Sequence, residues 1–155
     1  MSIIVNRRDL DFVLYEALDL NKILASEHYA DSDRESLDAM LDLCQSLAED
    51  QFLPFAAKLD ANEPKFVDGK VETIPEVKEA IAAYREAGLC TSAYDANIGG
   101  MQLPWMMDQA LNGMFVCANN PVHTYLFLTQ GVANMLNACG SDELKAKYLP
   151  KLVEG

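Results

Sequence analysis

The chain has 155 residues, half of them apolar, with 12 basic and 24 acidic side chains and a net charge of −12. This length and apolar content are typical of one globular domain with its own core. The negative charge repels nucleic-acid phosphates and anionic membrane surfaces, so we expect neither as a partner. No apolar run approaches the roughly 18 residues that cross a bilayer, so we expect no membrane span.

The cysteines are widely spaced and none forms a CxxC pair. We therefore expect no disulfide framework but buried thiols, in a reducing, cytoplasmic compartment. The first residues turn acidic at once and lack the apolar core of a signal peptide, which agrees with that location. The four cysteines are Cys44, Cys90, Cys117 and Cys139.

The N-terminal part of the chain predicts two helices. The first spans Asp9 to about Leu24, because acidic residues stand in its first turn, where the helix dipole favours carboxylates. The second begins at a predicted capping box, Ser32-Asp33-Arg34-Glu35. From Leu37 onward apolar residues recur at the i, i+3, i+4, i+7 spacing of an amphipathic helix, which we expect to run at least to Phe52.

The middle of the chain predicts a turn and a third helix. Asp68-Gly69, between short runs that mix apolar and polar residues, is typical of a tight turn, so we expect a small hairpin near residues 66–71. Pro75 at the first helical position and Gly88 as the C-cap bound the next helix. A single hairpin cannot found a sheet, so the hairpin does not change the fold class.

The C-terminal part predicts three more helices, over residues 104–118, 121–139 and from Ser141 to a stop at Pro150. The second of these is apolar on nearly every face, which is typical of the buried centre of a bundle. The predicted fold class is therefore all-α, a helical bundle of about six helices.

Candidate catalytic and metal-binding residues are few. His28 and His123 lie far apart without metal-ligand spacing, and the acidic residues fall on solvated helix faces, so we assign neither a metal site nor a catalytic residue. Gly99-Gly100 lacks the third glycine and preceding strand of a dinucleotide fingerprint, so no cofactor-binding residue is assigned. His123, beside Thr124, has two open interpretations: a histidine hydrogen-bonded at a helix N-terminus, or a residue lining a ligand cavity.

Several segments resemble acyl-CoA dehydrogenases. Residues 140–155 resemble the G-[ST]-x-E-x-x-x-x-[YF]-L-P-x-L-x-x-G stretch that closes the N-terminal helical domain of that family. Gly88-Leu89, a polar loop and Gly99-Gly100 resemble the family's A-G-[LF]…G-G loop, although many members carry G-G-x-G where Met101-Gln102 follow here. Residues 1–32 resemble the N-terminal extension of a long bacterial subfamily that includes methylthiopropionyl-CoA and related fatty acyl-CoA dehydrogenases.

The resemblance implies a FAD-dependent α,β-dehydrogenation of acyl-CoA thioesters, in the oxidation of fatty acids or related acyl groups. In that family a glutamate of the C-terminal helical domain takes the α-proton, while a hydride passes from the β-carbon to a flavin held mainly by the middle and C-terminal domains. Residues 1–32 would be an N-terminal extension, and residues 33–155 the N-terminal helical domain of a longer polypeptide. The substrate contacts implied for this domain, which would wall the acyl pocket, are His123, Thr124 and Phe127.

Three expectations follow from that resemblance. The chain by itself should be inactive and bind no FAD, because the flavin domains and the catalytic glutamate lie elsewhere. It should pack against the remaining domains of the same polypeptide, and the enzyme should form a homo-oligomer. An apolar patch should therefore be exposed, and we place it at Met106, Met107, Met114 or Phe115.

Two other interpretations remain open at this point. The chain could be a free-standing helical binding or interaction module derived from the same domain. It could also be an unrelated structural bundle, in which case the two long helices between residues 104 and 139 should not pack as the resemblance implies.

Overall fold

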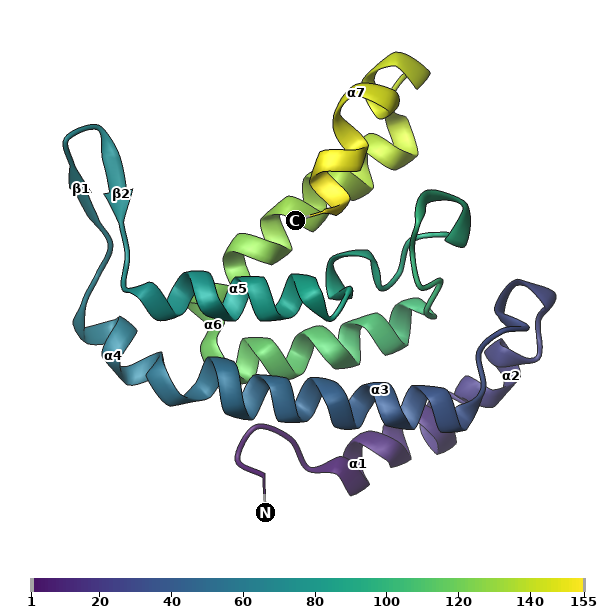
Figure 1. The fold of residues 1–155 in the computed structure, drawn as a ribbon. Coiled ribbons are helices and arrows are strands. Elements are labelled where there is room, and N and C mark those ends of the chain that lie inside the picture. Colours follow the sequence, from purple (N-terminus) through teal and green to yellow (C-terminus); the bar gives the residue numbers. More distant parts are fainter. Residues whose placement is uncertain (1, 155) are drawn as a thin grey trace.

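The computed structural model describes residues 2–154, and most of this range is helical (Figure 1). The predicted all-α fold class is confirmed. No helix in the described range combines the length and the apolar character needed to cross a bilayer. The α-helices are α1 (Arg7–Asp11), α2 (Leu20–Leu24), α3 (Arg34–Leu47), α4 (Ala56–Ala61), α5 (Pro75–Glu86), α6 (Trp105–Cys139) and α7 (Asp142–Val153).

The N-terminal segment is not the single helix that the sequence predicts. A π-helical stretch, Phe12–Ala17, follows α1, and the chain then breaks before α2 at Asp19, whose φ is 53°. Three consecutive apolar residues begin this stretch, and one straight helix cannot turn all of them to the same side. Aspartate is one of the few residues that adopts the left-handed conformation readily, so the break falls there.

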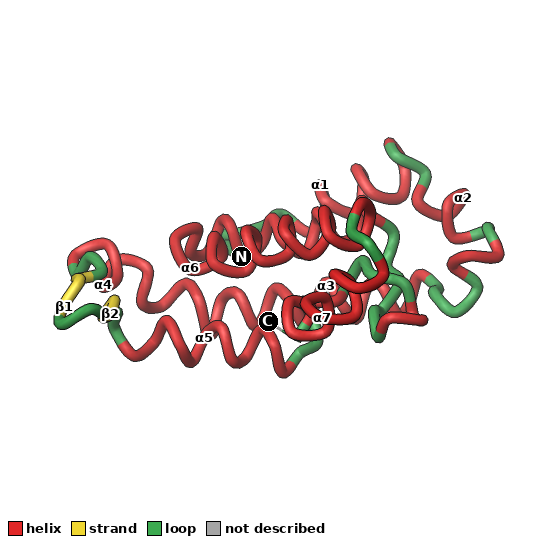
Figure 2. Tube along the Cα trace, turned by 90° about the horizontal axis from the view of Figure 1, so that it is seen from above, coloured by secondary structure: helices red, strands yellow, loops and turns green. Residues whose placement is uncertain are grey.

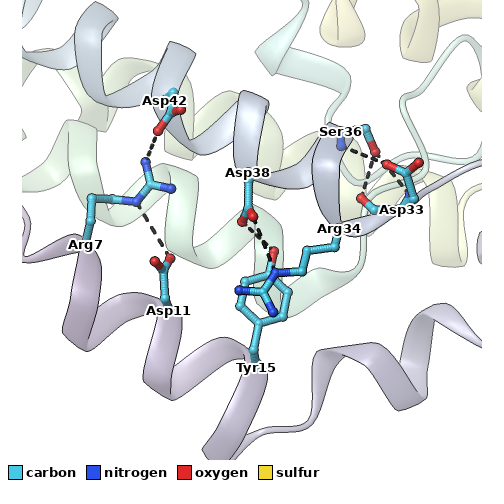
Figure 3. Close-up of polar contacts among 8 residues, drawn as sticks. All are labelled: Arg7, Asp11, Tyr15, Asp33, Arg34, Ser36, Asp38 and Asp42. Carbon is cyan, nitrogen blue, oxygen red and sulfur yellow. Dashed lines mark hydrogen bonds and ion pairs between the residues drawn. The ribbon is translucent and has the colours of Figure 1, made fainter.

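The N-terminal segment is held against α3 by polar contacts (Figure 3). The hydroxyl of Tyr15 donates a 2.8 Å hydrogen bond to Asp38, and the Arg34 guanidinium lies 4.1 Å above the Tyr15 ring. Arg7 forms an ion pair with Asp42 of α3. Burial and the neighbouring Asp38 raise the pKa of Tyr15, so its hydroxyl remains a donor at neutral pH.

The capping box of α3 lies one residue later than predicted. Asp33, rather than Ser32, is the N-cap: its carboxylate accepts from the backbone N–H of Ser36 at 2.8 Å, and the Asp33 N–H donates to the Ser36 hydroxyl at 3.1 Å. Both Ser32 and Asp33 are good capping residues, so the sequence alone does not choose between them. These hydrogen bonds lower the pKa of Asp33, which is therefore ionised at the positive end of the helix dipole.

The helical segment that α3 begins continues past Phe52, as predicted, but it is irregular after Leu47. A π-helical turn, Ala48–Phe52, and a 3-10 turn, Leu53–Phe55, connect α3 to α4 without a loop. Pro54 lies in the 3-10 turn, where its missing N–H breaks the regular α-helical hydrogen bonding.

The predicted hairpin is confirmed. Strands β1 (Lys65–Val67) and β2 (Lys70–Glu72) pair antiparallel, and Asp68 and Gly69 connect them with φ values of 48° and 79°. Two consecutive positive φ values are what a two-residue hairpin turn requires. The hairpin projects from one end of the molecule, opposite α2 (Figure 2).

Helix α6 is divided by a kink at Asn119, where φ is −160° and ψ is 81°. The predicted interruption at residues 119–121 is confirmed, because Pro121 lacks the N–H that an unbroken helix would use there. The side-chain amide of Asn119 donates a 3.0 Å hydrogen bond to the carbonyl of Phe52. The kink in α6 is therefore fastened to the π-helical turn that follows α3.

The part of α6 before the kink, and not the part after it, lies in the centre of the bundle. Met107, Met114 and Phe115 are almost completely buried, so our prediction that they form an exposed patch is wrong. Phe115 packs edge-on against Phe52 and Tyr84, with 4.9 Å between ring centroids in each pair. We call this region, formed by α3, α5 and residues 105–118, the bundle.

The part of α6 after the kink packs on α7, and we call these two elements, residues 121–139 and α7, the arm (Figure 1). Phe127, Leu128 and Met135 are 58%, 60% and 64% exposed, so the prediction of a central, buried helix is wrong. A helix that is apolar all round needs cover on several sides, but the described residues cover only some of them.

Helix α7 begins as predicted and ends later than predicted. The Ser141 hydroxyl accepts from the Leu144 N–H at 3.4 Å, which confirms the cap. The helix does not stop at Pro150 but continues to Val153. The cysteines also divide: Cys44 and Cys90 are buried as predicted, whereas Cys117 and Cys139 are exposed, and all four are free thiols.

Candidate functional site

A cavity of about 230 Å³ lies where the bundle meets the arm. Asp108 and Asn112 line it from the first part of α6, His123 and Phe127 from the second part, and Ser92 from the loop before α6. The kink in α6 is what creates this space, because it brings two segments of one helix to face each other across the cavity.

The loop that closes one side of the cavity is held by backbone hydrogen bonds. Gln102 N–H donates to the carbonyl of Tyr94, and Leu103 N–H donates to the carbonyl of Ser92, both at 2.9 Å. Gly100 is required here, since a Cβ on it would lie 1.9 Å from the Tyr94 carbonyl oxygen. The loop thereby directs Ser92 toward the cavity.

Gln102 stands where many acyl-CoA dehydrogenases have the last glycine of G-G-x-G, and its φ of 56° explains why glycine suits that position. Its side chain offsets the strain with hydrogen bonds. The amide oxygen accepts from the Ala96 N–H at 3.2 Å, and the amide nitrogen donates to the carbonyl of His28 in the N-terminal segment.

The buried polar side chains at the base of the cavity form one connected network. Asp108 accepts from the Ser92 hydroxyl at one carboxylate oxygen and from Asn112 Nδ2, at 3.0 Å, at the other. Asn112 Oδ1 accepts from the Tyr84 hydroxyl at 3.0 Å and lies 3.0 Å from His123 Nε2. A fully connected network of this kind holds each of its members in one orientation.

Burial controls the charge of this network. Desolvation raises the pKa of Asp108, while the hydrogen bonds from Ser92, Gln109 and Asn112 act in the opposite direction. Desolvation lowers the pKa of His123, so the imidazole is neutral at pH 7. In the part of the chain that the structure describes, Asp108 forms no ion pair.

The structure brings two of the three sequence-predicted substrate contacts together. His123 and Phe127 both line the cavity, with 6.3 Å between their ring centroids. Thr124 is exposed and does not line it, and its hydroxyl donates to the Asn120 carbonyl of the same helix at 2.9 Å. The side chain of His123 is hydrogen-bonded through Nε2 and also borders the cavity.

Sequence reasoning missed Asp108, Asn112 and Ser92. A signal for the first two was present: they are four residues apart, so they share one face of the helix, and that face also carries Phe115. Polar residues beside a buried stripe indicate an internal network. Ser92 carries no such signal, because only the loop conformation places it beside Asp108.

The described residues bring no metal site together, and the cavity between the bundle and the arm does not match FAD. No three His, Cys, Asp or Glu side chains within residues 2–154 come together as a metal site would require. The cavity, at about 230 Å³, is smaller than the roughly 300–1,000 Å³ of a site for a drug-sized ligand, and no lysine or arginine lines it to meet a pyrophosphate. The cavity therefore does not fit a flavin dinucleotide.

Comparison with known proteins identifies the class of protein. The family described as "Acyl-CoA dehydrogenase, N-terminal domain" matches residues 34–155. The matched range includes the whole bundle, the arm and the cavity between them. The chain belongs to the acyl-CoA dehydrogenase family, of which it contains the N-terminal domain, so an unrelated structural bundle is excluded.

Individual relatives match nearly the whole chain. A butyryl-CoA dehydrogenase of Syntrophomonas wolfei is 32% identical over 154 residues, which cover 96% of this chain. A broad-specificity linear acyl-CoA dehydrogenase of Mycobacterium tuberculosis is 32% identical over 143 residues, or 90% of this chain. A 3-methylmercaptopropionyl-CoA dehydrogenase of Ruegeria pomeroyi is 24% identical over 148 residues. The chain spans only about a quarter of the length of these relatives.

Proposed function

We propose that this chain is the acyl-pocket wall of a FAD-dependent enzyme that dehydrogenates short-chain acyl-CoA thioesters between the α- and β-carbons. The cavity bordered by His123 and Phe127 is the observation that carries the proposal, because these two residues were assigned to the substrate from the family resemblance and meet at one cavity. The name of one relative, a butyryl-CoA dehydrogenase, supports a short-chain substrate, and that of a second, a broad-specificity linear acyl-CoA dehydrogenase, supports an acyl-CoA thioester more generally.

In this proposal the chemical steps belong to other domains of the enzyme, and binding of the acyl group belongs to this chain. FAD would accept the hydride of the β-carbon, and the base for the α-proton would come from the C-terminal domain; neither is assigned to this chain. The chain would bind the acyl group, exclude water from it and orient it. Residues 1–32 would be an extension packed on α3, and residues 33–155 the domain proper.

The size of the cavity favours a short acyl chain. Its volume of about 230 Å³ is below the usual range for a site of a drug-sized ligand, and Trp105 and Phe127 are part of its lining. Both side chains are more than half exposed. Exposed aromatic rings beside a cavity are well placed to be covered by another domain, which would complete the pocket.

Chain-length preference in the full-length enzyme tests the proposal. The protein with FAD should oxidise butyryl-CoA in an assay with an artificial electron acceptor. Phe127→Ala enlarges the cavity, so kcat/KM should move toward longer acyl chains, by about tenfold for a gain of one or two methylene contacts. Thr124→Val should have a smaller effect, because Thr124 does not line the cavity.

Tyr125→Ala is the matched control, because Tyr125 is an exposed aromatic residue of the same helix that does not line this cavity. It should leave the chain-length profile unchanged. A full-length, unmodified enzyme that does not oxidise any acyl-CoA would contradict the proposed function. An identical chain-length profile for Phe127→Ala and the unmodified enzyme would contradict the assignment of Phe127 to the acyl pocket.

A cytoplasmic location and a homo-oligomeric enzyme remain part of the proposal.

A free-standing binding module is the second candidate function. It is favoured only by the small core of the arm, which gives residues 121–153 apolar contacts of their own. A natural protein of this length that binds an acyl-CoA without oxidising it would support this alternative.

A further inference from the structure

The hydrogen bonds of Asn112 determine which ring nitrogen of His123 carries the proton. Asn112 Nδ2 lies 3.0 Å from Asp108 Oδ2, an oxygen that also accepts from Gln109 at 3.1 Å. The Asn112 amide oxygen therefore faces the opposite way, where it accepts from Tyr84 and lies 3.0 Å from His123 Nε2. Because an amide oxygen can only accept, Nε2 must carry the proton.

The other ring nitrogen, Nδ1, is consequently a hydrogen-bond acceptor. His123 is only 2% exposed and lines the cavity, and its Nδ1 atom makes no hydrogen bond to any residue in the range 2–154. Nδ1 keeps access to solvent in the cavity, so an occupant that displaces this solvent must donate a hydrogen bond itself or leave the acceptor unpaired. The cavity should therefore prefer an occupant that donates a hydrogen bond at this point.

The charges around the cavity select against anionic occupants. Asp108, which is 4% exposed, is part of the lining, whereas no lysine or arginine is. A ligand carboxylate would be desolvated near Asp108 with no cation to balance it. The rest of the lining includes apolar surface from Trp105, Val116 and Phe127, which suits an alkyl chain.

We infer that this cavity binds a short, uncharged chain whose buried end is a hydroxyl or a primary amide that donates a hydrogen bond to Nδ1 of His123. The inference rests on the proposed function in that it takes the cavity as the acyl site, and it narrows the acyl group to one with a polar, neutral end. Asn112 and Asp108 are positioning residues, because they hold the His123 ring in the tautomer that leaves Nδ1 free.

Nitrogen NMR of the chain labelled at histidine tests this inference, because the two ring nitrogens have distinct chemical shifts in each tautomer. The His28→Gln variant leaves His123 as the only histidine and keeps the His28 carbonyl that Gln102 binds. The unliganded protein should show the Nε2–H tautomer. Titration with 1-butanol should shift the Nδ1 signal in a saturable manner.

Two further probes isolate the hydrogen bond and the charge. Methyl propyl ether has the same atoms as 1-butanol but no donor, so it should bind about fivefold more weakly and leave the Nδ1 signal unshifted. Butyrate should not bind measurably, because its carboxylate would lie near Asp108.

A pair of asparagine variants tests the role of Asn112. Asn112→Leu removes the acceptor of Nε2–H, so it should produce a mixture of tautomers and abolish the preference for 1-butanol. Asn137→Leu is the matched control, because Asn137 lies on the same helix as His123 but does not line this cavity. It should preserve both the tautomer and the preference.

An Nδ1–H tautomer in the unliganded protein, or equal affinity for 1-butanol and its ether isomer, would overturn the inference. If Asn112→Leu does not fold, the comparison of ligands in the His28→Gln chain still decides the matter. Failure of the proposed function would appear separately, as a full-length enzyme that does not oxidise acyl-CoA while His123 retains its tautomer.

Discussion

The two parts of α6, before and after the kink at Asn119, are both apolar, but they are buried very differently. Met107 and Phe115 lie in the core of the bundle, whereas Leu128 and Met135 of the arm are more than half exposed. The apolar character of a helix therefore indicates how much of it needs cover. It does not indicate whether the neighbouring residues of the same domain provide that cover.

The two regions also differ in the size of their cores. The bundle has a continuous core with an aromatic cluster at its centre. The arm shares a separate, small core with the loop before α6; its buried members are Ala133 and Leu149 of the arm and Tyr94 of the loop. We therefore expect substitutions in the bundle to change stability strongly, and substitutions on the arm to change mainly what the arm binds.

The largest expected difference is between two phenylalanines of α6. Phe115→Ala should lower the free energy of unfolding by about 3–5 kcal/mol, because it leaves a cavity among Phe52, Tyr84 and their neighbours. Phe127→Ala should change it by no more than about 0.5 kcal/mol, because Phe127 is 58% exposed. Urea unfolding followed by circular dichroism measures both, and equal losses would contradict the comparison.

The second effect depends on pH and concerns Asp108, where the bundle meets the arm. Burial raises its pKa in the folded state, so the folded protein holds this proton more tightly than the unfolded chain does. Its contribution to stability is complete below the unfolded pKa and is lost as the pH rises through the folded pKa. Asp108→Asn removes the titration, so its stability relative to the unmodified protein should improve from pH 3 to pH 7.

Measuring the stability of both proteins by urea unfolding across this pH range cancels the contributions of all other titrating groups. A difference in stability that does not change with pH, or that changes in the opposite direction, would show that Asp108 is ionised without penalty in the fold.

A smaller effect is expected at Gln102, which connects the N-terminal segment to the loop beside the arm. Gln102→Ala removes the hydrogen bonds to Ala96 and His28 but keeps the positive φ, so it should destabilise by about 1 kcal/mol. Gln102→Gly loses the same bonds but relieves the backbone strain, so its net effect should be roughly zero. Thermal unfolding distinguishes the two, and an alanine variant as stable as the glycine variant would refute the strain.

The smallest effect on stability is expected on the outer face of the arm. Leu128→Gln combined with Met135→Gln should change the free energy of unfolding by no more than about 0.5 kcal/mol, because both side chains are mostly exposed. It should nevertheless reduce self-association in static light scattering, because it removes apolar surface. Unchanged association would show that this face does not mediate self-association. Tyr125→Gln is the control, because it changes another exposed position of the same helix.

Local features of the fold could be predicted because a few residues determine them. Asp68-Gly69 requires a tight turn, and Ser141 caps α7, whatever lies around them. The cap of α3 was misplaced by one residue because Ser32 and Asp33 have nearly equal capping ability. The exposure of residues 121–139 could not be predicted, since it depends on which segments pack against that helix.

The candidate site could be predicted only in part, for the same reason. His123 and Phe127 were assigned through family resemblance and meet at the cavity, but the residues that orient His123 were not recognised. Asn112 and Asp108 acquire their roles only when the kink turns His123 back toward them. Interactions between residues on either side of a kink depend on its angle, which sequence periodicity does not contain.

The hydrogen bond from Asn119 to the Phe52 carbonyl has an evolutionary consequence. It connects the kink of α6 to the π-helical turn Ala48–Phe52, which follows α3. This turn therefore helps to set the distance between the two parts of α6 that line the cavity. Insertions or deletions in the turn would then retune ligand size while every lining side chain stayed the same. Relatives with identical linings but different turn lengths should therefore prefer acyl groups of different bulk, and matched specificity profiles would argue against this.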